Sequence, residues 1–466
     1  MNLGFVAHEN VWRVRLEHRN NVGRKRGKVC RICCSKPVDF DIVVVGGGIA
    51  GLAFSAALKT VLKWQGSLLV IEQSSLEGLE TGSALGLWTN AFKCLDALGK
   101  PLSRTLRDKS CALQGVRIRD AERGKLLKNI PLDKCEGGPH EFAYVRRNDL
   151  QEQLRSLCLS SQDIKFLEGE TVEHIRKDDC MRVVCSSGVQ LKCRIVIGAD
   201  GIGSVVRKFL NPCLRWPRTI KSNGYMAFRG IVSLNQLPKN VTNELESSWR
   251  SHISQIWGKG IRAGVAPLDL YHWYWFLTVN ENKLDNEAIF QDNLHLCQEK
   301  LSKLLLDWVF PIPQLVQCTK VENLHVHRCA DSLDILLPRK YFSLASYPVT
   351  LIGDAAHPTT PNLAQGAALA LEDALVLACH LFHACSSPSV NKDIIQQALY
   401  NYEDERLLRT QRLVIQSHMI GKLLQLENSW ICFLRDHVGT KVFLRSRAFL
   451  RHAIWDVPQC FLRSNQ

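Results

Sequence analysis

The sequence has no window of about 18 consecutive apolar residues, the length that a membrane-spanning helix requires, so we predict no transmembrane helix. Its most apolar stretch, Ala367 to His383, carries Glu372 and Asp373 and therefore indicates a buried helix of a soluble fold. Internal repeats and low-complexity segments are also missing, so the chain is not a repeat array. With 466 residues it is long enough for two or three domains around a large core.

Closely paired cysteines are scarce, although the chain contains 18 cysteines. They are mostly spread singly and no secretory signal is visible, so we expect reduced thiols in a reducing compartment. Cys30, Cys33 and Cys34 hint at a zinc knuckle, but no second ligand pair lies at a suitable distance. We therefore predict no metal site.

Acidic residues are fewer than basic ones, which gives a formal net charge of +14. Residues 1–38 hold nine Lys and Arg against Glu9 and Glu17. This basic N-terminal extension has the composition of an organelle transit peptide, although it is poor in serine. The alternatives are a disordered basic tail and a rarely used upstream start codon. A transit peptide would imply a chloroplast or other organelle, and the alternatives imply the cytoplasm. Because the remaining charge is scattered, we predict no nucleic-acid binding.

A dinucleotide-binding pattern follows the extension, between Asp39 and Gln73. An apolar strand at Ile42–Val45 precedes Gly46, Gly48 and Gly51, whose G-x-G-x-x-G spacing opens a helix. A second strand ends at Glu72, where an acid binds a ribose hydroxyl pair while the helix N-terminus faces a pyrophosphate. The combination indicates a dinucleotide but does not separate NAD from FAD.

Two further apolar strands end in turns rich in Gly and Asp, at GADGIGSVVR (198–207) and GDAAHPTTPNLAQG (353–366), and a helix is expected to begin near Leu363. Ligands of doubly wound sheets bind at the carboxyl ends of strands. We therefore expect three loops at one sheet edge. A nicotinamide dehydrogenase needs mainly the first loop, whereas FAD is long enough to need all three.

Residues 216–342 differ in composition from the segments before them. Strand sequences rich in aromatic residues, such as Tyr271–Val279, dominate this region, and helical sequence lies between Asn286 and Trp308. They predict a separate, more antiparallel layer. Before this region, Asn148 is predicted to cap a helix that runs to about Leu157. The chain is helical in character from Lys392 onward.

The three motifs, GGGIAGL at Gly46–Leu52 and the two just quoted, occur in the order typical of the FAD-dependent aromatic hydroxylase family, the single-component flavoprotein monooxygenases. The chain resembles this family, and within it the plant salicylate-hydroxylase-like, urate-hydroxylase-like and zeaxanthin-epoxidase-like members. The resemblance spans most of residues 40–380. It implies an α/β fold: a Rossmann-like, GR2-type FAD-binding domain, a substrate domain with a mixed or antiparallel sheet, and C-terminal helices.

The resemblance also implies domain boundaries. Residues 1–38 are the extension, and residues 386–466 are the C-terminal helices. The FAD-binding domain comprises 39–112, 143–215 and 343–385, and the substrate domain comprises 113–142 and 216–342.

The family's cofactor-binding residues carry over to matching positions of this chain. Asp354 resembles the acid that accepts a hydroxyl proton of the FAD chain, and Asp200 the acid serving both FAD and the nicotinamide donor, with a plain turn residue as its alternative. Arg147 resembles the Arg near the FAD chain, with Arg146 as competitor, while Arg207 is expected to pair within the fold. The predicted cofactor-binding set is Gly46, Gly48, Ile49, Ala50, Gly51, Glu72, Arg147, Asp200, Gly353, Asp354, Pro361, Gly366 and Ala367.

The resemblance makes Arg229 and Pro361 the candidate catalytic residues. Arg229 lies in an F-R-G that faces flavin and substrate in relatives, and a surface salt bridge is its alternative. His357 is expected to be structural. The stripe of Tyr271, Trp273 and Trp275 lines an apolar substrate cavity or packs in the core. His325 and His327 share a strand face, which does not make a metal site.

The chain departs from the family at three positions. Ala364 and Ala367 stand where relatives have glycine close to the flavin ring, and Leu79-Glu80 replaces a frequent Arg. Each change bears on flavin affinity.

The activity that the resemblance implies is an NADH- or NADPH-dependent monooxygenase. It would hydroxylate or epoxidise a small aromatic or isoprenoid substrate with O2 through a flavin hydroperoxide, as a monomer or homodimer. One alternative is an FAD-dependent isoprenoid reductase, which consumes NADPH without O2. Another is a non-catalytic binder of lipidated proteins, like the GDP-dissociation inhibitors, which needs only the first glycine turn.

The C-terminal stretch Thr440–Trp455 alternates basic and bulky apolar residues. At helical spacing it could rest on a membrane surface, but we favour a helix that covers the FAD domain.

Overall fold

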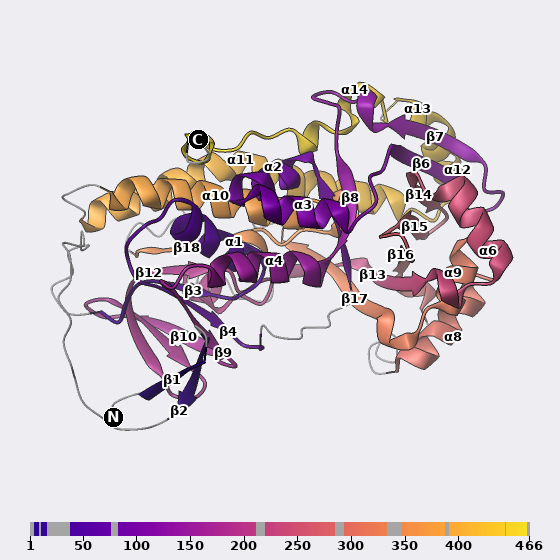
Figure 1. Ribbon diagram of the computed structural model, residues 1–466. Coiled ribbons are helices and arrows are strands. Elements are labelled where there is room, and N and C mark those ends of the chain that lie inside the picture. Colours follow the sequence, from indigo (N-terminus) through magenta and orange to yellow (C-terminus); the bar gives the residue numbers. More distant parts are fainter. Residues whose placement is uncertain are drawn as a thin grey trace.

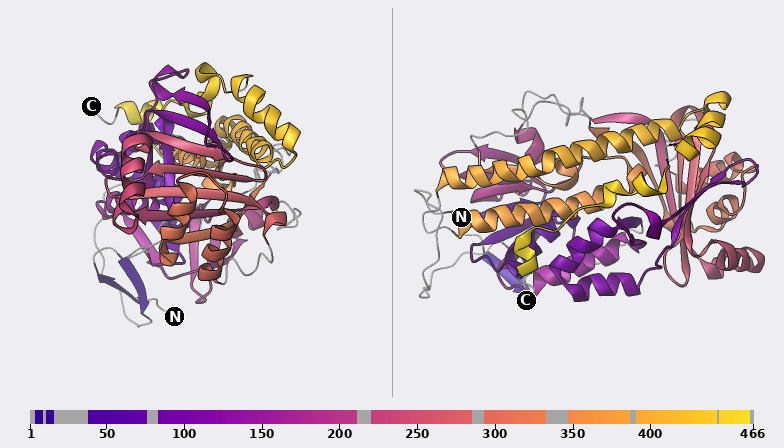
Figure 2. Two further views of the ribbon diagram at one scale, coloured as in Figure 1. Left: turned by 90° about the vertical axis from the view of Figure 1, so that its right-hand side faces the viewer. Right: turned by 90° about the horizontal axis from the view of Figure 1, so that it is seen from above.

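The computed structural model describes residues 4–8, 11–15, 38–75, 83–210, 220–284, 293–332, 347–386, 391–442 and 444–463. Figure 1 shows two sheets at opposite ends of the molecule, joined by two long helices, α10 (Gly366–Cys385) and α11 (Lys392–Leu424). The same two helices run side by side when the molecule is seen from above (Figure 2).

The first sheet is mixed, with a parallel centre. Its strands, in spatial order, are β1 (Gly4–His8), β2 (Val11–Arg15), β9 (Ile164–Glu168), β4 (Leu68–Glu72), β3 (Phe40–Val45), β12 (Gln190–Gly198), β11 (Met181–Cys185) and β10 (Val172–Lys177), with β18 (Val349–Leu351) also beside β12. Strands β9, β4, β3, β12 and β18 run parallel. The apolar run of β3 is buried on both faces, as a central parallel strand requires.

The second sheet is largely antiparallel, as predicted. Its order is β17 (Leu324–Ser332), β13 (Ile220–Ser233), β16 (His272–Asn280), β15 (Ile261–Pro267), β14 (His252–Trp257), β6 (Gly115–Asp120) and β7 (Leu126–Pro131). A two-stranded ribbon, β5 (Ala84–Trp88) and β8 (Phe142–Arg146), accompanies the two sheets.

The remaining helices cover the two sheets. They are α1 (Ile49–Ser55), continued by the π-helical turn η1 (Ala56–Val61), α2 (Thr89–Leu98), α3 (Lys100–Asp108), α4 (Arg147–Leu159), α5 (Val205–Leu210), α6 (Lys239–Glu244), α8 (Leu294–Leu304), α9 (Ile312–Cys318), α12 (Ser429–Leu434), α13 (Thr440–Val442), α14 (Ser446–Phe449) and α15 (Gln459–Arg463).

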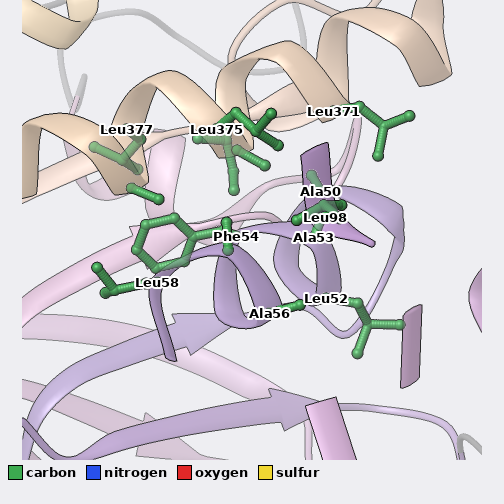
Figure 3. Close-up of a cluster of buried hydrophobic side chains, with 14 of the residues drawn as sticks. Ala50, Leu52, Ala53, Phe54, Ala56, Leu58, Leu98, Leu371, Leu375 and Leu377 are labelled. Atoms are coloured by element: carbon green, nitrogen blue, oxygen red, sulfur yellow. The ribbon is translucent and has the colours of Figure 1, made fainter. Parts of the chain in front are cut away.

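The core of the FAD-binding half lies between α1 and α10. Figure 3 shows Phe54 and Leu58 facing Leu375 and Leu377 across this interface, with Leu371 further along α10 on the side of Ala50, and these five large side chains are fully buried. Helix α10 is long and apolar enough to cross a membrane, but 78% of its apolar window is buried inside the protein. It is a core helix, as the sequence predicts.

Three features differ from the sequence predictions. Residues 4–8 and 11–15 form a hairpin that pairs with β9, so this part of the extension is not a disordered tail, while the transit-peptide alternative stays a prediction. Helix α4 begins at Arg147, so Asn148 is not its N-cap. The stretch Thr440–Trp455 is not one helix: it divides into α13, α14 and a 3-10 turn, and Leu450 and Ala453 are buried in the cluster beneath the second sheet.

Candidate functional site

The three predicted loops meet at one edge of the first sheet. Gly198 at the end of β12 pairs with Val45 at the end of β3 and with Leu351 at the end of β18. The carboxyl ends of these strands are therefore in register. This arrangement confirms the expectation that the three loops lie at one edge of the sheet. The turns that follow β3, β12 and β18 form the candidate site.

The glycine turn after β3 is fixed by close contacts. Gly46 has a φ of +106°, and a Cβ there would lie 2.4 Å from the carbonyl oxygen of Ala199. A Cβ at Gly51 would lie 2.0 Å from the carbonyl oxygen of Gly46. Gly48, in contrast, faces open space, since a Cβ added there would meet nothing within 4 Å. The turn therefore presents bare backbone to a ligand at the start of α1.

Glu72 reaches this glycine turn. One carboxylate oxygen accepts from the Gly47 N–H at 2.7 Å, and the other accepts from the Ser74 N–H at 3.0 Å. The acid is thus held at the end of β4, at the position predicted for ribose binding.

Asp354 lies in the third loop, where it is exposed yet surrounded by protein that raises its pKa by desolvation. The charges of His357, Arg147 and Arg207 oppose this rise. Among the described residues, no hydrogen bond or ion pair satisfies its carboxylate. The accessible carboxylate caps no helix in the described part of the chain and is free to accept a hydrogen bond from a ligand hydroxyl.

Asp200 is engaged within its own loop. Its carboxylate accepts from the Ser204 hydroxyl at 2.6 Å and from the Val205 N–H at 2.7 Å, at the start of α5. This geometry favours the turn-residue alternative, and its cofactor role stays a prediction. Arg207 is buried and donates to the Ile202 carbonyl at 2.6 Å, a bond within the fold as expected.

Arg147 and Arg146 point to different partners. Arg147 is exposed and donates to Gln151 at 3.3 Å, and its charge lowers the pKa of Asp354, whereas Arg146 forms an ion pair with Asp269 at 3.0 Å. The cofactor role of Arg147 stays a prediction.

A buried charge network holds the third loop in place. Asp373 on α10 accepts from the Gly353 N–H at 2.9 Å and from Arg406 at 2.7 Å, and it also binds His357. His357 is therefore structural, as predicted. Gly353 has a φ of +61° and lies against Ala50, where a Cβ would be 3.1 Å from the Ala50 Cβ.

The loop then forms a 3-10 turn at Pro361–Leu363, and α10 begins at Gly366, three residues later than predicted. Ala364 adopts a left-handed conformation with a φ of +52°, which glycine adopts without strain and alanine does not. Gly366 and Ala367 form the first turn of α10 and are half-buried. Leu79 and Glu80 lie outside the described residues.

Side chains from three parts of the chain hold this loop, and the sequence predicted none of them. The Trp88 indole donates to the Leu363 carbonyl at 3.0 Å. Asn362 donates to the Tyr225 hydroxyl at 3.1 Å and accepts from Arg262 at 2.9 Å. The loop therefore joins the edge of the first sheet to one face of the second sheet.

That face is aromatic. Tyr144 lies 4.8 Å from Tyr274 and 5.1 Å from Phe142 between ring centroids, and Phe142 lies 4.1 Å from Trp88. Arg229 is half-buried on the same face, opposite Phe276 of β16 and His325 of β17. Among the described residues it has no ion-pair partner, so the surface salt bridge that was its alternative is not seen.

The predicted aromatic stripe packs on the other face. Trp273 and Trp275 are fully buried in the cluster formed with α8 and α9, and the Trp275 indole donates to the Thr319 hydroxyl at 2.8 Å. Tyr271 precedes β16 and is 67% exposed. The cavity-lining interpretation of this stripe is therefore wrong, because Tyr274 and Phe276, one residue out of step, face the loop.

One cluster of metal-binding residue types occurs elsewhere, on α10 and α15. Ligand atoms of Cys379, His383 and Cys460 lie within 4.8 Å of one another. Structural zinc sites use four protein ligands, and three are gathered here. The described cysteines are free thiols, and Cys30, Cys33 and Cys34 lie outside the described residues.

The site thus fits FAD: bare glycine backbone faces open space, one acid lies at a strand end, and one accessible carboxylate has no partner among the described residues. The comparisons with known proteins agree. The family profile "FAD binding domain" matches residues 343–417, and the profile "Lycopene cyclase protein" matches residues 41–235.

Similar proteins cover nearly the whole chain. Aurachin C monooxygenase/isomerase of Stigmatella aurantiaca is 28% identical, over 85% of this chain and 92% of its own length. Monooxygenase 2 of Arabidopsis thaliana is 27% identical, over 89% and 97%. The crystal structure of Klebsiella pneumoniae HpxO with FAD and uric acid has a TM-score of 0.69 at 21% identity, over 91% and 97%, and shows the shared fold.

Proposed function

We propose that the chain, which is similar to FAD-dependent monooxygenases along most of its length, uses NADH or NADPH and O2 to insert one oxygen atom into a small aromatic substrate. The observation that carries the proposal is the loop 353–366. Asp354 lies at its start, at the edge of the first sheet, and Asn362 further along it contacts the aromatic face of the second sheet.

Reduced FAD supplies the chemistry, namely activation of O2 and transfer of one oxygen atom. The chain's own residues bind and position. Gly46 and Gly48 would receive the pyrophosphate, and Glu72 and Asp354 would hold hydroxyl groups. The N-terminus of α10 at Gly366 would favour negative charge on a ring bound there by about 0.3–1 kcal/mol.

The substrate would lie against the aromatic face that contains Tyr144, Tyr274 and Phe276. Aromatic walls exclude water and offer stacking and edge contacts to a planar ring. The lycopene cyclase match covers residues 41–235, mostly the dinucleotide-binding half, so it bears little on the substrate. An isoprenoid reductase remains the second candidate and differs in needing no O2.

The charge of the proposed substrate follows from Arg262 on β15. Its side chain is buried, Nη1 donates to Asn362, and Nε has no partner among the described residues. Burial lowers the pKa of Arg262 to about 10, so it is charged at neutral pH. Within the described part of the chain it forms no ion pair.

A buried guanidinium without an anion is costly. An anionic substrate would compensate this charge, and the guanidinium lies beside Phe276, 5.1 Å from the ring centroid. We therefore propose an aromatic anion, such as a carboxylate or a phenolate, as the substrate class.

Replacing Arg262 by methionine should weaken binding of an aromatic carboxylate by roughly ten- to 150-fold, since a hydrogen bond to a charged group contributes about 1.5–3 kcal/mol. Binding of the matching neutral amide should change much less, and FAD content, measured alongside, reports any effect of the lost bond to Asn362. Titration of the FAD-loaded protein, followed by the flavin spectrum, measures both ligands. Arg262→Lys is the matched control that keeps the charge. Equal losses for acid and amide would contradict the anion assignment.

Anaerobic reduction tests the proposed cofactor use. Mixing the FAD-loaded protein with NADH or NADPH in the presence of the bound acid should bleach the flavin, and admission of O2 should restore its colour. A flavin that stays oxidised with both donors would contradict the proposed function.

A further inference from the structure

The segment from Ser429 to Val442 turns its apolar side outward. It comprises α12, the π-helical turn η11 (Arg435–Gly439) and α13, and we call it the 429–442 helix. Its large apolar side chains are exposed by 46 to 78%, an arrangement opposite to that of an ordinary surface helix. They are Trp430, Ile431, Phe433, Leu434, Val438 and Val442.

The inner side of this helix is polar and fixes the orientation. Arg435 is buried and donates to the carbonyls of Leu424 at 3.2 Å and Gly258 at 3.1 Å, with its guanidinium over the Trp257 ring. Asn428 caps the helix by accepting from the Trp430 N–H at 3.0 Å. Rotation of the helix to bury its apolar side would break these bonds, so the outward apolar side is built into the fold.

The exposed aromatic rings form a continuous strip. Trp430 and Phe433 lie 6.5 Å apart between centroids, and Phe433 stacks on His437 at 4.4 Å. Figure 1 shows α12 and α13 at the end of the molecule formed by the second sheet. A helix of this length extends about 20 Å along the surface.

The C-terminal end of the strip is basic. Between Asn428 and Trp455 the sequence has five Lys and Arg, of which Arg435 pairs with Asp436 and Arg451 pairs with Glu136, and the acids Glu427 and Asp456 flank this stretch. Lys441 and Arg445 are exposed. A second copy docking here about a twofold axis would bring these like charges together, whereas an anionic surface complements them.

We propose that the 429–442 helix binds the surface of an anionic membrane. Trp430, Phe433 and Leu434 would enter the boundary between headgroups and acyl chains, and Lys441 and Arg445 would contact lipid phosphates. The sequence suggested membrane contact for residues 440–455; the exposed apolar side lies upstream of most of that stretch. The proposal is independent of the substrate and of the flavin reaction.

Co-sedimentation of the FAD-loaded protein with vesicles tests this proposal. Vesicles of phosphatidylcholine mixed with phosphatidylglycerol should carry the protein down, and phosphatidylcholine alone should carry less. The double variant Trp430→Ser, Phe433→Ser should lower the partition coefficient by about tenfold or more, because it removes the inserted apolar area. Lys441→Gln with Arg445→Gln should lower binding to the anionic vesicles only.

The matched control is Leu306→Ser, which replaces another apolar residue that is 78% exposed. It should bind vesicles like the unaltered protein. Flavin content and thermal midpoint confirm that each variant is folded. The proposal is overturned if the unaltered protein stays in the supernatant, or if Leu306→Ser lowers binding as much as the double variant. It is also overturned if the double variant dissociates a dimer while vesicle binding is unchanged.

Discussion

Replacing Asp354 by alanine is expected to remove bound FAD while leaving the fold intact. The carboxylate is accessible, its pKa is raised by desolvation, and no described side chain or backbone group satisfies it. Because the Asp354 carboxylate makes no hydrogen bond to a described residue, its replacement removes no such bond from the FAD-free protein. With FAD, loss of a charge-assisted hydrogen bond worth about 1.5–3 kcal/mol weakens affinity roughly ten- to 150-fold.

Flavin absorbance after desalting, followed by titration with FAD, measures this effect. The thermal midpoint of the FAD-free variant should stay close to that of the FAD-free parent, because replacement of an exposed side chain without a partner among the described residues changes stability little. Asp133→Ala, which removes an exposed acid from the turn Leu132–Lys134, is the matched control and should retain flavin. Full flavin retention by Asp354→Ala would refute the role assigned to this acid.

Replacing Asp373 by alanine is expected to lower the free energy of unfolding by about 3–5 kcal/mol, the cost of leaving buried charges unpaired. Asp373 is fully buried and holds the Gly353 N–H, His357 and Arg406. Its removal would leave the Asp354 turn without its anchor, so flavin binding should fall together with stability. Urea unfolding at neutral pH measures the first effect. A change below about 1 kcal/mol would show that the network is not a stabilising element.

The pH dependence of this stability is a second signature of the network. Burial raises the pKa of Asp373, but His357 and Arg406 outweigh burial and lower it to about 2. The unfolded value is about 3.9. The stabilisation is therefore fully present above about pH 4 and is lost as the pH falls through about 2. The difference in unfolding free energy between parent and variant should shrink over this window.

Much of the site could be predicted because it depends on local backbone chemistry. The glycines at 46, 48 and 51 and the acids at 72 and 354 follow strands whose burial is visible in their apolar runs. Parallel strands place such turns at one edge, so three motifs sufficed to predict three converging loops.

The choice between the two faces of the second sheet could not be predicted. Strand β16 is apolar on both faces, so the alternation of Trp273 and Trp275 with Tyr274 and Phe276 gives no sign of which pair faces the loop. Helices α8 and α9 decide this by covering the tryptophan face. Arg262 was also missed, although an arginine in a strand that is otherwise apolar and buried was a usable signal.

The N-terminal hairpin and the 429–442 helix show a second limit. The alternation in VWRVR (Val11–Arg15) is typical of a strand, but the basic charge and low acid content of the whole extension are equally typical of a segment without fixed structure. For the 429–442 helix, the sequence periodicity shows that one side is apolar but does not show whether that side faces the protein or the solvent. Arg435 decides this, because its contacts with the Leu424 and Gly258 carbonyls hold the polar side inward.

Mass analysis of the product formed under isotopically labelled O2 tests the central claim most directly. The FAD-loaded protein is supplied with NADH or NADPH and a panel of phenolic acids, urate and carotenoids. We expect one aromatic acid to accelerate nucleotide oxidation and to yield a product carrying one labelled oxygen atom. A product formed without labelled oxygen, or one that is reduced in the absence of O2, would contradict the monooxygenase assignment.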